Sequence, residues 1–319
     1  MSLGPDLPPL IVVTGPTATG KTVLGVALAR RLGGEIVNAD SRYLYRGLNI
    51  GTAKPTVTER GGVPHHLIDV VGPSDEMSLA TYQDLAFAAI GDVTGRGRLP
   101  ILVGGTPLYV NAVVESWRIP RVPPHPEIRA RIEAEIAERG LEAVAARLAE
   151  VDPVTAERSG RNARRVVRAL EIHEVTGRRM SELEGKGPAR HDTVMLVLEV
   201  DRAELHLRID WRIDEHIAAG LLHEVRGLLA AGVAATAPAM SSIGYRQLIP
   251  VLDGRVSLAE GVEAIRRDTR RYVKHQSTWL RRVTDAVRID AVAPDLVERA
   301  VAAVGPLLDR HGRLVRVEP

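Results

Sequence analysis

The sequence predicts an α/β protein, in which a parallel sheet flanked by helices is interrupted by an all-helical insertion domain. Three observations support this fold class. A glycine-rich, phosphate-binding motif lies between a short apolar strand and an amphipathic helix near the N-terminus. Further strands and helices then alternate along the chain, as they do in parallel sheets. Midway along, a proline-rich stretch introduces charged helices before a β-branched strand returns.

The secondary structure of the first hundred residues is predicted from β-branched runs, from helical apolar spacing and from the glycines that end helices. The first strand leads into the glycine-rich motif, and the second ends shortly before Asp40. Ser78 is a candidate cap for the second helix. The predicted strands are 10–13, 35–38, 66–71 and 99–103, and the predicted helices are 22–32 and 78–93.

The chain changes character near Trp117. A stretch with four prolines, 119–126, is followed by charged helices at 127–150 and 162–176. A Gly-Lys-Gly-Pro sequence then breaks the chain, and a strand returns at 193–200, with long helices after it. We therefore expect a core made of 1–116 and 191–319, with an insertion domain over 117–190.

The composition is that of an ordinary globular protein. Hydrophobic residues make up 45% of the 319 residues and charged residues 26%. No apolar run approaches the ~20 residues that cross a bilayer, so we expect no membrane partner and a cytoplasmic location. The chain has no cysteine, which excludes disulfides and zinc–thiolate sites.

Basic residues are concentrated in two stretches, although the net charge is only +2. Residues 266–282 contain seven Lys and Arg residues against one acid, and a second cluster of four arginines lies within 161–168. Tyr272 and Trp279 lie among the first group, which suits a phosphate backbone beside an unstacked base. A solvated helix face anchored by Trp279 has the same pattern, so both interpretations stay open.

The glycine-rich motif matches G-x-x-x-x-G-K-[ST] between a strand and a helix, and it predicts a P-loop NTPase-like core. Its backbone N–H groups converge on phosphate oxygens, Lys21 supplies a positive charge, and the Thr22 hydroxyl is a ligand for Mg²⁺. The motif indicates a di- or triphosphate without saying which. Its residues are Gly15, Pro16, Thr17, Ala18, Thr19, Gly20, Lys21 and Thr22.

Two polar residues follow other predicted strands at the same edge of the sheet. Asp40 comes after the second strand, and Thr106 follows Gly104-Gly105 at the end of the strand 99–103. Ligands of parallel sheets bind beyond the carboxyl ends of the strands. Asp40 is then a general base, a helix cap or a Mg²⁺ ligand, and the spacing does not separate these roles. A turn with a helix cap explains Thr106 nearly as well as a role in binding.

Several segments, in order along the chain, resemble the bacterial tRNA dimethylallyltransferases, also called tRNA isopentenyltransferases. The phosphate loop alone is generic. The combination of Gly-Thr-Ala-Lys-Pro with Lys-x-Gln-x-Thr-Trp is specific. The matching segments are 15–22, 40–42, 51–55, 102–106, 164–171, 243–246 and 274–281.

This resemblance implies a reaction with two substrates. The donor is dimethylallyl diphosphate, and the acceptor is the exocyclic amine of the adenosine on the 3′ side of the tRNA anticodon. The loop amides, Lys21, Mg²⁺ on Thr22 and Arg212 would stabilise the departing pyrophosphate, with Arg208 as a further candidate. Asp40 would accept a proton from the flipped-out adenine, and Thr106 would orient Asp40 or the base. We expect the protein to act as a monomer.

The resemblance also assigns tRNA contacts to residues from several parts of the chain. They are Asp40, Ser41, Arg42, Tyr43, Thr106, Arg129, Arg164, Arg165, Arg168, Gly244, Tyr245, Arg246, Lys274, Gln276 and Arg281.

Two residues depart from the family's pattern. Relatives often carry glutamine where this chain has Tyr43, which would stack on a base instead. His275 stands where relatives frequently carry arginine. One contact with a tRNA phosphate would therefore be weaker or pH-dependent.

Two other functions fit parts of the sequence. One is a P-loop kinase or prenyltransferase that acts on free adenylate, but it leaves the insertion domain and the basic stretch 266–282 without a purpose. The other is a nucleotide-dependent switch or RNA-binding module without group transfer. A switch needs an acidic, nucleotide-sensing strand end, and the strand 99–103 ends in Gly104-Gly105 instead.

Overall fold

A computed structural model describes residues 7–313 of the chain. The chain forms two compact units, which are described separately here. The core unit contains the residues up to Val114 together with those from Arg190 onward, and the inserted unit is Glu115–Ala189.

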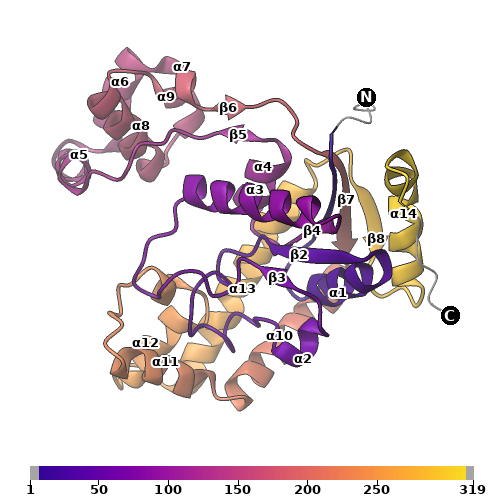
Figure 1. Ribbon diagram of the computed structural model, residues 1–319. Helices are drawn as coiled ribbons and strands as arrows, with labels where there is room; N and C mark the ends of the chain where they lie inside the picture. The colour runs from indigo at the N-terminus through magenta and orange to yellow at the C-terminus, as the bar shows by residue number, and fades with distance from the viewer. Residues whose placement is uncertain (1–6, 314–319) are drawn as a thin grey trace. The chain divides into compact units, whose positions relative to one another are not determined.

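The core unit is built on a six-stranded sheet in which every neighbouring pair of strands is parallel (Figure 1). This confirms the predicted α/β fold with a P-loop between strand and helix. In sheet order the strands are β3 (His65–His66), β2 (Gly34–Asn38), β4 (Leu99–Val103), β1 (Pro9–Thr14), β7 (Asp192–Glu199) and β8 (Val287–Asp290).

The third strand is much shorter than the sequence suggested. A strand was predicted over 66–71, but β3 ends at His66. Leu67 and Asp69 both have a positive φ, 62° and 58°, which turns the chain out of the extended conformation. Val71 then forms only an isolated bridge with Tyr45.

Helices cover both faces of the sheet (Figure 1). Side chains of β1 alternate between them: Ile11 and Val13 belong to one apolar cluster, and Leu10 and Val12 to another. Burial of both faces explains why this strand is a continuous apolar run. The first cluster is closed by α1 (Lys21–Leu32) and α14 (Leu296–Arg310), and the second by α3 (Leu79–Gly95) and α4 (Pro107–Val114).

A third apolar cluster joins the helices that follow β7 to the segment after β2. Tyr45 and Leu48 of that segment pack into this cluster. The short helix α2 (Val57–Arg60) follows the same segment. The remaining helices are α10 (Arg202–Ala218), α11 (Leu221–Ala230), the 3-10 turn η1 (Ala239–Ser241), α12 (Tyr245–Leu252) and α13 (Leu258–Leu280).

The inserted unit is helical apart from a two-stranded antiparallel ribbon, β5 (Trp117–Arg118) with β6 (Gly185–Lys186). The helix predicted over 127–150 is in fact two helices, because Gly140 adopts a φ of 84° that interrupts it. The helices are α5 (Pro126–Arg139), α6 (Leu141–Val151), α7 (Pro153–Ser159), α8 (Ala163–Thr176) and α9 (Met180–Leu183).

Among the helices formed by residues 7–313, none is both long and apolar enough to span a membrane.

Candidate active site

The phosphate loop connects β1 to α1 at the carboxyl edge of the sheet. Gly20 caps α1 in the left-handed conformation, with a φ of 83°, and Ala18 is also left-handed. The first N–H groups of α1 have no partner inside the helix and carry the positive end of its dipole. These groups are free to bind an anion.

Lys21 lies inside this loop. Its Nζ atom donates a hydrogen bond to the carbonyl of Pro16 at 2.6 Å. Burial lowers the pKa of Lys21 to about 8; the nearby carboxylate of Asp40 opposes this shift, and the guanidinium of Arg212 adds to it. An anion that binds in the loop would therefore contact an ammonium group whose loss of hydration is only partly offset by the charge of Asp40.

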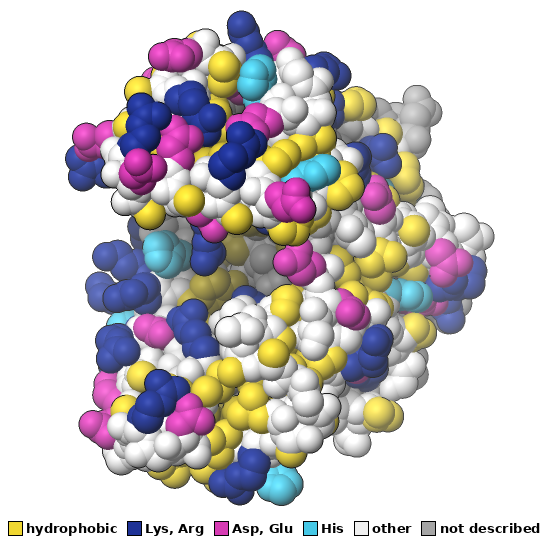
Figure 2. Space-filling view, turned by 90° about the vertical axis from the view of Figure 1, so that its left-hand side faces the viewer, with side chains coloured by type: hydrophobic (Ala, Val, Ile, Leu, Met, Phe, Trp, Pro, Cys, Tyr) yellow, Lys and Arg dark blue, Asp and Glu magenta, His cyan; other side chains and the backbone are white. Residues whose placement is uncertain are grey.

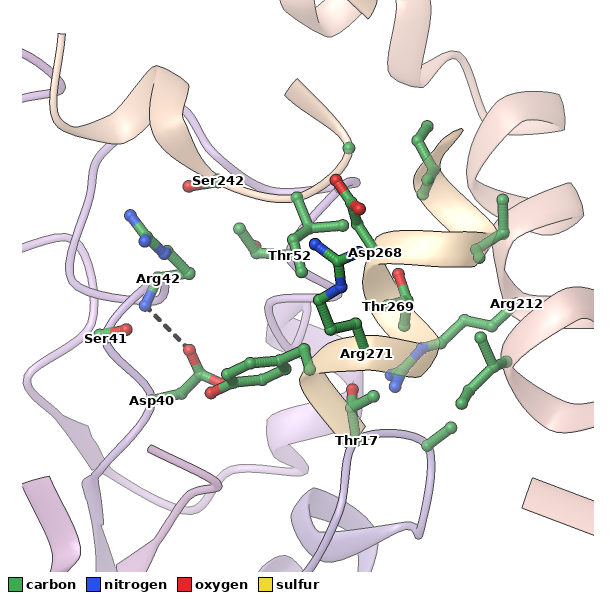
Figure 3. A pocket seen from close by; sticks show the side chains of 18 of the residues that line it. Thr17, Asp40, Ser41, Arg42, Thr52, Arg212, Ser242, Asp268, Thr269 and Arg271 are labelled. Atoms are coloured by element: carbon green, nitrogen blue, oxygen red, sulfur yellow. Dashed lines mark hydrogen bonds between the residues drawn. The ribbon is translucent and has the colours of Figure 1, made fainter. Parts of the chain in front are cut away.

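Asp40 is held just beyond the end of β2. Its Oδ1 atom accepts a hydrogen bond from the backbone N–H of Arg42 at 2.8 Å, which is the dashed line in Figure 3. The side chain of Asn38 binds both the N–H and the carbonyl of Asp40. The carboxylate thus takes part in a tight turn, and the same turn directs it into a pocket.

The loop after β4 approaches the Asp40 turn closely because of Gly104. A Cβ atom at this position would lie 2.1 Å from the backbone carbon of Ala39, so only glycine fits. The close approach lets Thr106 reach the turn: its Oγ1 atom accepts a hydrogen bond from the N–H of Ser41 at 3.0 Å. Thr106 therefore holds the segment that carries Asp40, one of the two roles considered for it.

These three loops open into one pocket of about 590 Å³ (Figure 3). Arg212 of α10 enters it opposite Asp40, on the side of Thr17. Its walls combine polar groups with an apolar surface from α10, α11 and α13. The apolar lining residues on these three helices are Ile209, Ile213, Leu221 and Ile265.

Two further ring side chains line this pocket. Burial, helped by Arg212, lowers the pKa of His216 to about 4, so His216 is neutral near pH 7. Burial raises the pKa of Tyr272 to about 12, which keeps its hydroxyl protonated. Tyr272 is therefore a neutral hydrogen-bonding group beside Asp40.

A much smaller space of about 30 Å³ lies behind the phosphate loop. It is lined by Lys21, Thr22 and Asp40, among others, so Asp40 faces both pockets. Oxygen ligands of this kind suit Mg²⁺, which also takes oxygens from bound phosphates. No cluster of three His, Cys, Asp or Glu residues that could hold a metal occurs within 7–313. The Thr22 hydroxyl and the Asp40 carboxylate, which line this space, fit a Mg²⁺ ion that a bound diphosphate would help to hold.

Several residues expected at the site are engaged elsewhere. Arg208 forms an ion pair with Glu204 of its own helix at 2.8 Å and does not line the pocket, and its expected contact with the pyrophosphate stays a prediction. Tyr43 is half-buried, its hydroxyl donates to the carbonyl of Ala53 and burial raises its pKa, and its expected stacking on a base stays a prediction.

Two residues of the expected tRNA set, Tyr245 and Gln276, are buried by the fold, and Trp279 of the basic stretch is partly buried. Tyr245 is fully buried and its hydroxyl donates to Glu224. Gln276 is 2% exposed, with both ends of its amide bound to backbone groups. Trp279 packs against the core cluster on the α3 face of the sheet. The side chains of Tyr245 and Gln276 are therefore covered by the fold in this conformation, whereas Trp279 keeps part of its surface exposed.

In the inserted unit, Arg129 and Arg168 bind the same carboxylate. Glu171 is completely buried and accepts from Arg129 Nε at 2.8 Å and Arg168 NH1 at 2.5 Å. Burial opposes ionisation of Glu171, but these arginines and the N–H of His125 hold its pKa below the ordinary value. Both arginines are thus paired internally, although the one carboxylate balances only one of their two positive charges.

The basic stretch on α13 is divided in the same way. Arg266 and Arg270 pair with acids of α10, and Arg267 pairs with Asp268. The exposed Lys274 and Arg281 make no ion pair with any residue of 7–313. Arg164 and Arg165 of the inserted unit are exposed, although basic and acidic side chains are interspersed on the face of that unit shown at the top of Figure 2.

Two supporting residues were not singled out from the sequence. Glu224 accepts hydrogen bonds from the N–H groups of Asn49, Ile50 and Gly51, and so holds this segment against the pocket. Asn38 holds Asp40. The Asn-Ala-Asp sequence at the end of a predicted strand could have indicated that Asn38 supports Asp40. No feature of the sequence indicated the role of Glu224.

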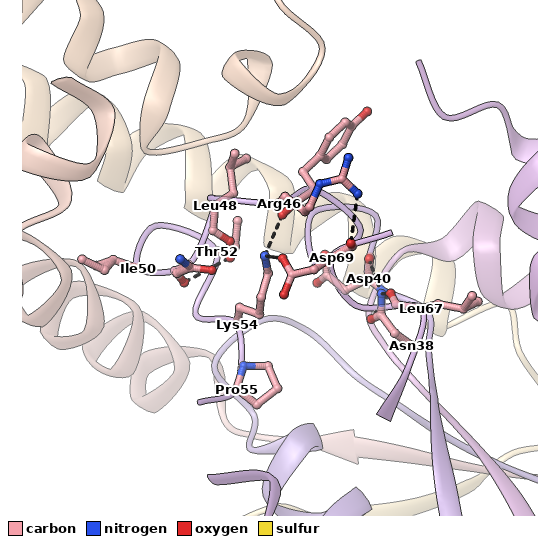
Figure 4. Close-up of polar contacts among 12 residues, drawn as sticks. Asn38, Asp40, Arg46, Leu48, Ile50, Thr52, Lys54, Pro55, Leu67 and Asp69 are labelled. Carbon is pink, nitrogen blue, oxygen red and sulfur yellow. Dashed lines mark hydrogen bonds and ion pairs between the residues drawn. The ribbon is translucent and has the colours of Figure 1, made fainter. Parts of the chain in front are cut away.

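Lys54 supports the same segment from inside (Figure 4). Its Nζ atom is buried and donates to the carbonyl of Tyr45 and to the Oδ1 atom of Asp69, both at 2.6 Å. Burial lowers its pKa, and Asp69 opposes that shift. Through these two hydrogen bonds, Lys54 stabilises the conformation of the segment between Asp40 and α2.

The fold and this pocket define a P-loop protein of the transferase class. The sequence model of the IPP transferase family matches residues 43–283. The chain belongs to the IPP transferase family.

Individual relatives agree along nearly the whole chain. It is 50% identical to a tRNA dimethylallyltransferase from Thermomicrobium roseum, over 91% of this chain and 89% of the relative. It is 49% identical to one from Roseiflexus castenholzii, over 94% of this chain and 99% of the relative.

Solved structures are similar over the same length. The full-length tRNA isopentenylpyrophosphate transferase from Bacillus halodurans has a TM-score of 0.72 at 38% identity, covering 95% of this chain and 97% of that one. A eukaryotic dimethylallyltransferase described as acting on tRNA has a TM-score of 0.81 at 26% identity, covering 98% and 81%.

Proposed function

We propose that this protein transfers a dimethylallyl group from dimethylallyl diphosphate to the exocyclic amine of the adenosine on the 3′ side of the tRNA anticodon, releasing pyrophosphate. The observation that carries the proposal is the pocket of about 590 Å³, in which the phosphate loop, Arg212 and Asp40 converge beside an apolar wall. Membership of the IPP transferase family supports the same reaction.

The donor would bind with its diphosphate on the phosphate loop. The N–H groups at the start of α1, together with Lys21 and Arg212, supply positive charge where the leaving pyrophosphate develops negative charge. An allylic diphosphate ionises readily, so stabilising the leaving group is the main requirement. Thr22 would hold Mg²⁺ together with the diphosphate. When bound, Mg²⁺ would neutralise part of the charge on the departing group.

The acceptor adenine would enter the open side of the same pocket. A base inside an anticodon loop reaches a buried donor only when it leaves the stack. The carboxylate of Asp40 then accepts a proton from the amine as the new carbon–nitrogen bond forms. Thr106 fixes the turn that carries Asp40, through the N–H of Ser41.

The tRNA contacts would come from the residues that the fold leaves exposed or at the pocket rim. Ser41, Arg42 and Arg246 line the pocket, and Lys274 and Arg281 lie on the exposed face of α13. In the inserted unit, the exposed Arg164 and Arg165 are the candidates, in place of Arg129 and Arg168.

The test is incubation of the protein with radiolabelled dimethylallyl diphosphate and Mg²⁺, with either unmodified bulk tRNA or AMP as acceptor. We expect label in the tRNA, at an adenosine next to the anticodon in nuclease digests, and little in AMP. A Lys21→Ala variant serves as the inactive control. Equally efficient labelling of AMP would contradict the proposal and favour a nucleotide prenyltransferase.

A further inference from the structure

One buried side chain of α13 connects the phosphate loop to the loop that follows β4. The Oε1 atom of Gln276 accepts a hydrogen bond from the N–H of Thr17 at 3.0 Å. Its Nε2 atom donates to the carbonyl of Gly105 at 2.7 Å. Thr17 belongs to the proposed donor site, and Gly105 precedes Thr106, which holds the Asp40 turn. A single amide therefore spans the two substrate sites.

The fit around this amide is tight. Gln276 is 2% exposed, and a Cβ atom on Gly105 would lie 2.7 Å from its Nε2 atom. Thr106 and Gln276 also act on Tyr272, one turn earlier on α13: both lower the pKa of its hydroxyl against the larger rise caused by burial. Because buried polar groups lose much when they lose their partners, this arrangement strongly favours one position of α13 relative to both loops.

The other side of α13 faces the proposed RNA. Lys274 and His275 are exposed, and Arg271 and His275 line the open pocket. Residues 274 and 276 are two apart in a helix and so point to opposite sides. RNA held by the exposed side would thus restrain the same helix that carries Gln276 to the phosphate loop.

We infer that Gln276 couples the two substrate sites, so that RNA bound to α13 stabilises the hydrogen bond to Thr17 and with it the form of the phosphate loop that binds the diphosphate. This inference rests on the proposed function. Two arrangements are involved: one in which Gln276 holds Thr17 and Gly105, and one in which α13 has shifted and both bonds are lost. RNA favours the first. Because coupling is reciprocal, the bound diphosphate also strengthens RNA binding by the same factor.

A purely structural role for Gln276 predicts something different. Loss of the amide would then weaken the binding of both substrates, or lower the stability of the protein. It would not change the factor by which one bound substrate alters the affinity for the other. The ratio of donor affinities with and without RNA distinguishes the two roles.

The experiment measures binding of a non-transferable thiolo analogue of dimethylallyl diphosphate by calorimetry, with and without a saturating anticodon stem-loop RNA. In the wild-type protein we expect RNA to tighten analogue binding by about 5-fold or more. In Gln276→Met, which keeps the length of the side chain and removes its hydrogen bonds, we expect this ratio to fall close to 1.

The matched control is Gln83→Met. Gln83 is equally buried, and its Nε2 atom donates to the carbonyl of Ala112 rather than to the site. We expect the wild-type ratio in this variant. If Gln276→Met does not fold, Gly105→Ala provides a second disturbance, since the new Cβ atom displaces Nε2 of Gln276. It too should reduce the ratio.

The outcomes separate the two hypotheses. Binding of both ligands to the wild-type protein with a ratio of 1 would overturn the coupling and leave the proposed function intact. The coupling is also overturned if Gln276→Met and Gly105→Ala weaken binding but keep the ratio. Failure of the wild-type protein to bind either ligand would instead contradict the proposed function itself.

Discussion

Asn38 holds the backbone of Asp40 from both sides. Its Oδ1 atom accepts the N–H of Asp40 at 2.8 Å, and its Nδ2 atom donates to the carbonyl of the same residue at 2.9 Å. The same Nδ2 atom donates to the carbonyl of Leu67, which joins the turn to the residue directly after strand β3. The direction of the Asp40 carboxylate therefore depends on Asn38, which is itself 2% exposed (Figure 4).

Asn38→Ala should slow prenyl transfer by about 10- to 100-fold, because a small displacement of a catalytic group costs rates of this order. Donor affinity should stay within about 2-fold of wild type, since the hydrogen bonds of the Asn38 side chain go to Asp40 and Leu67. Single-turnover rates at saturating tRNA and the affinity of the donor analogue check this. A wild-type rate in a folded variant would show that the turn holds Asp40 without Asn38.

Asp40→Asn should slow the chemical step by about 10² to 10⁴, the usual contribution of a positioned general base. The amide keeps an oxygen that can accept the N–H of Arg42, so the turn should survive. Both substrates should still bind. The measurement is again the single-turnover rate, with the RNA affinity as control. Transfer at the normal rate would leave Asp40 with a structural role in the turn only.

Lys21→Ala should abolish detectable donor binding and leave tRNA binding largely unchanged. Lys21 is the partly buried cation of the phosphate loop, whereas Lys274 and Arg281 lie on the exposed face of α13. Calorimetry with the donor analogue and filter binding with tRNA measure the two affinities separately. If RNA affinity, measured without the donor, fell in parallel with donor affinity, this division would be contradicted. The coupling through Gln276 predicts only that the variant loses the increase in RNA affinity that a bound donor gives the wild-type protein.

Changing Lys274 and Arg281 together to alanine should flatten the salt dependence of tRNA binding. Each phosphate contact contributes about −0.7 to −0.9 to the slope of log K against log salt, so two contacts contribute roughly 1.5. The matched control changes Arg31 and Arg299 to alanine; Arg31 pairs with Glu298 of α14, and Arg299 pairs with Asp295, just before α14. The control slope should equal that of the wild type. An unchanged slope in the first variant would mean that these two cations do not contact phosphate.

Asp152 should make the stability of the inserted unit depend on pH in acid. Burial alone would raise its pKa, but hydrogen bonds from Thr155 and Ser181 outweigh it and lower the pKa to about 2. The pKa of Asp152 is thus depressed in the folded state, so its contribution is complete above about pH 4 and disappears as the pH falls toward 2. We expect a loss of about 2 kcal/mol over that range.

Asp152→Asn is the control for this acid effect, since an amide can accept the N–H of Thr155 but does not titrate. Hydrogen exchange within α7, followed at several pH values with correction for intrinsic exchange, measures the effect in both proteins. Parallel curves for wild type and variant would show that Asp152 is not the group responsible.

Much of the fold followed from local patterns. The strand, glycine-rich loop and helix at 10–32 are contiguous in sequence, so β-branched residues, glycines and helical spacing were enough to predict them. The break at Gly140 and the early end of β3 were missed, because a single residue with positive φ can redirect a segment whose apolar pattern continues past it. The position of β4 between β2 and β1 depends on pairing between distant strands, which periodicity does not report.

By itself, the sequence determined the P-loop core, the carboxyl edge at which Asp40 and Thr106 meet the phosphate loop, and the family. These follow from residue order and from the rule that parallel strands present their carboxyl ends together. Only the tertiary structure decided which side chains remain available to a substrate. Arg129 and Arg168 are tied to Glu171, and Gln276 reaches Thr17 across 259 positions of sequence. Burial and ion pairing depend on which surfaces pack together, and the local pattern of residues does not contain that information.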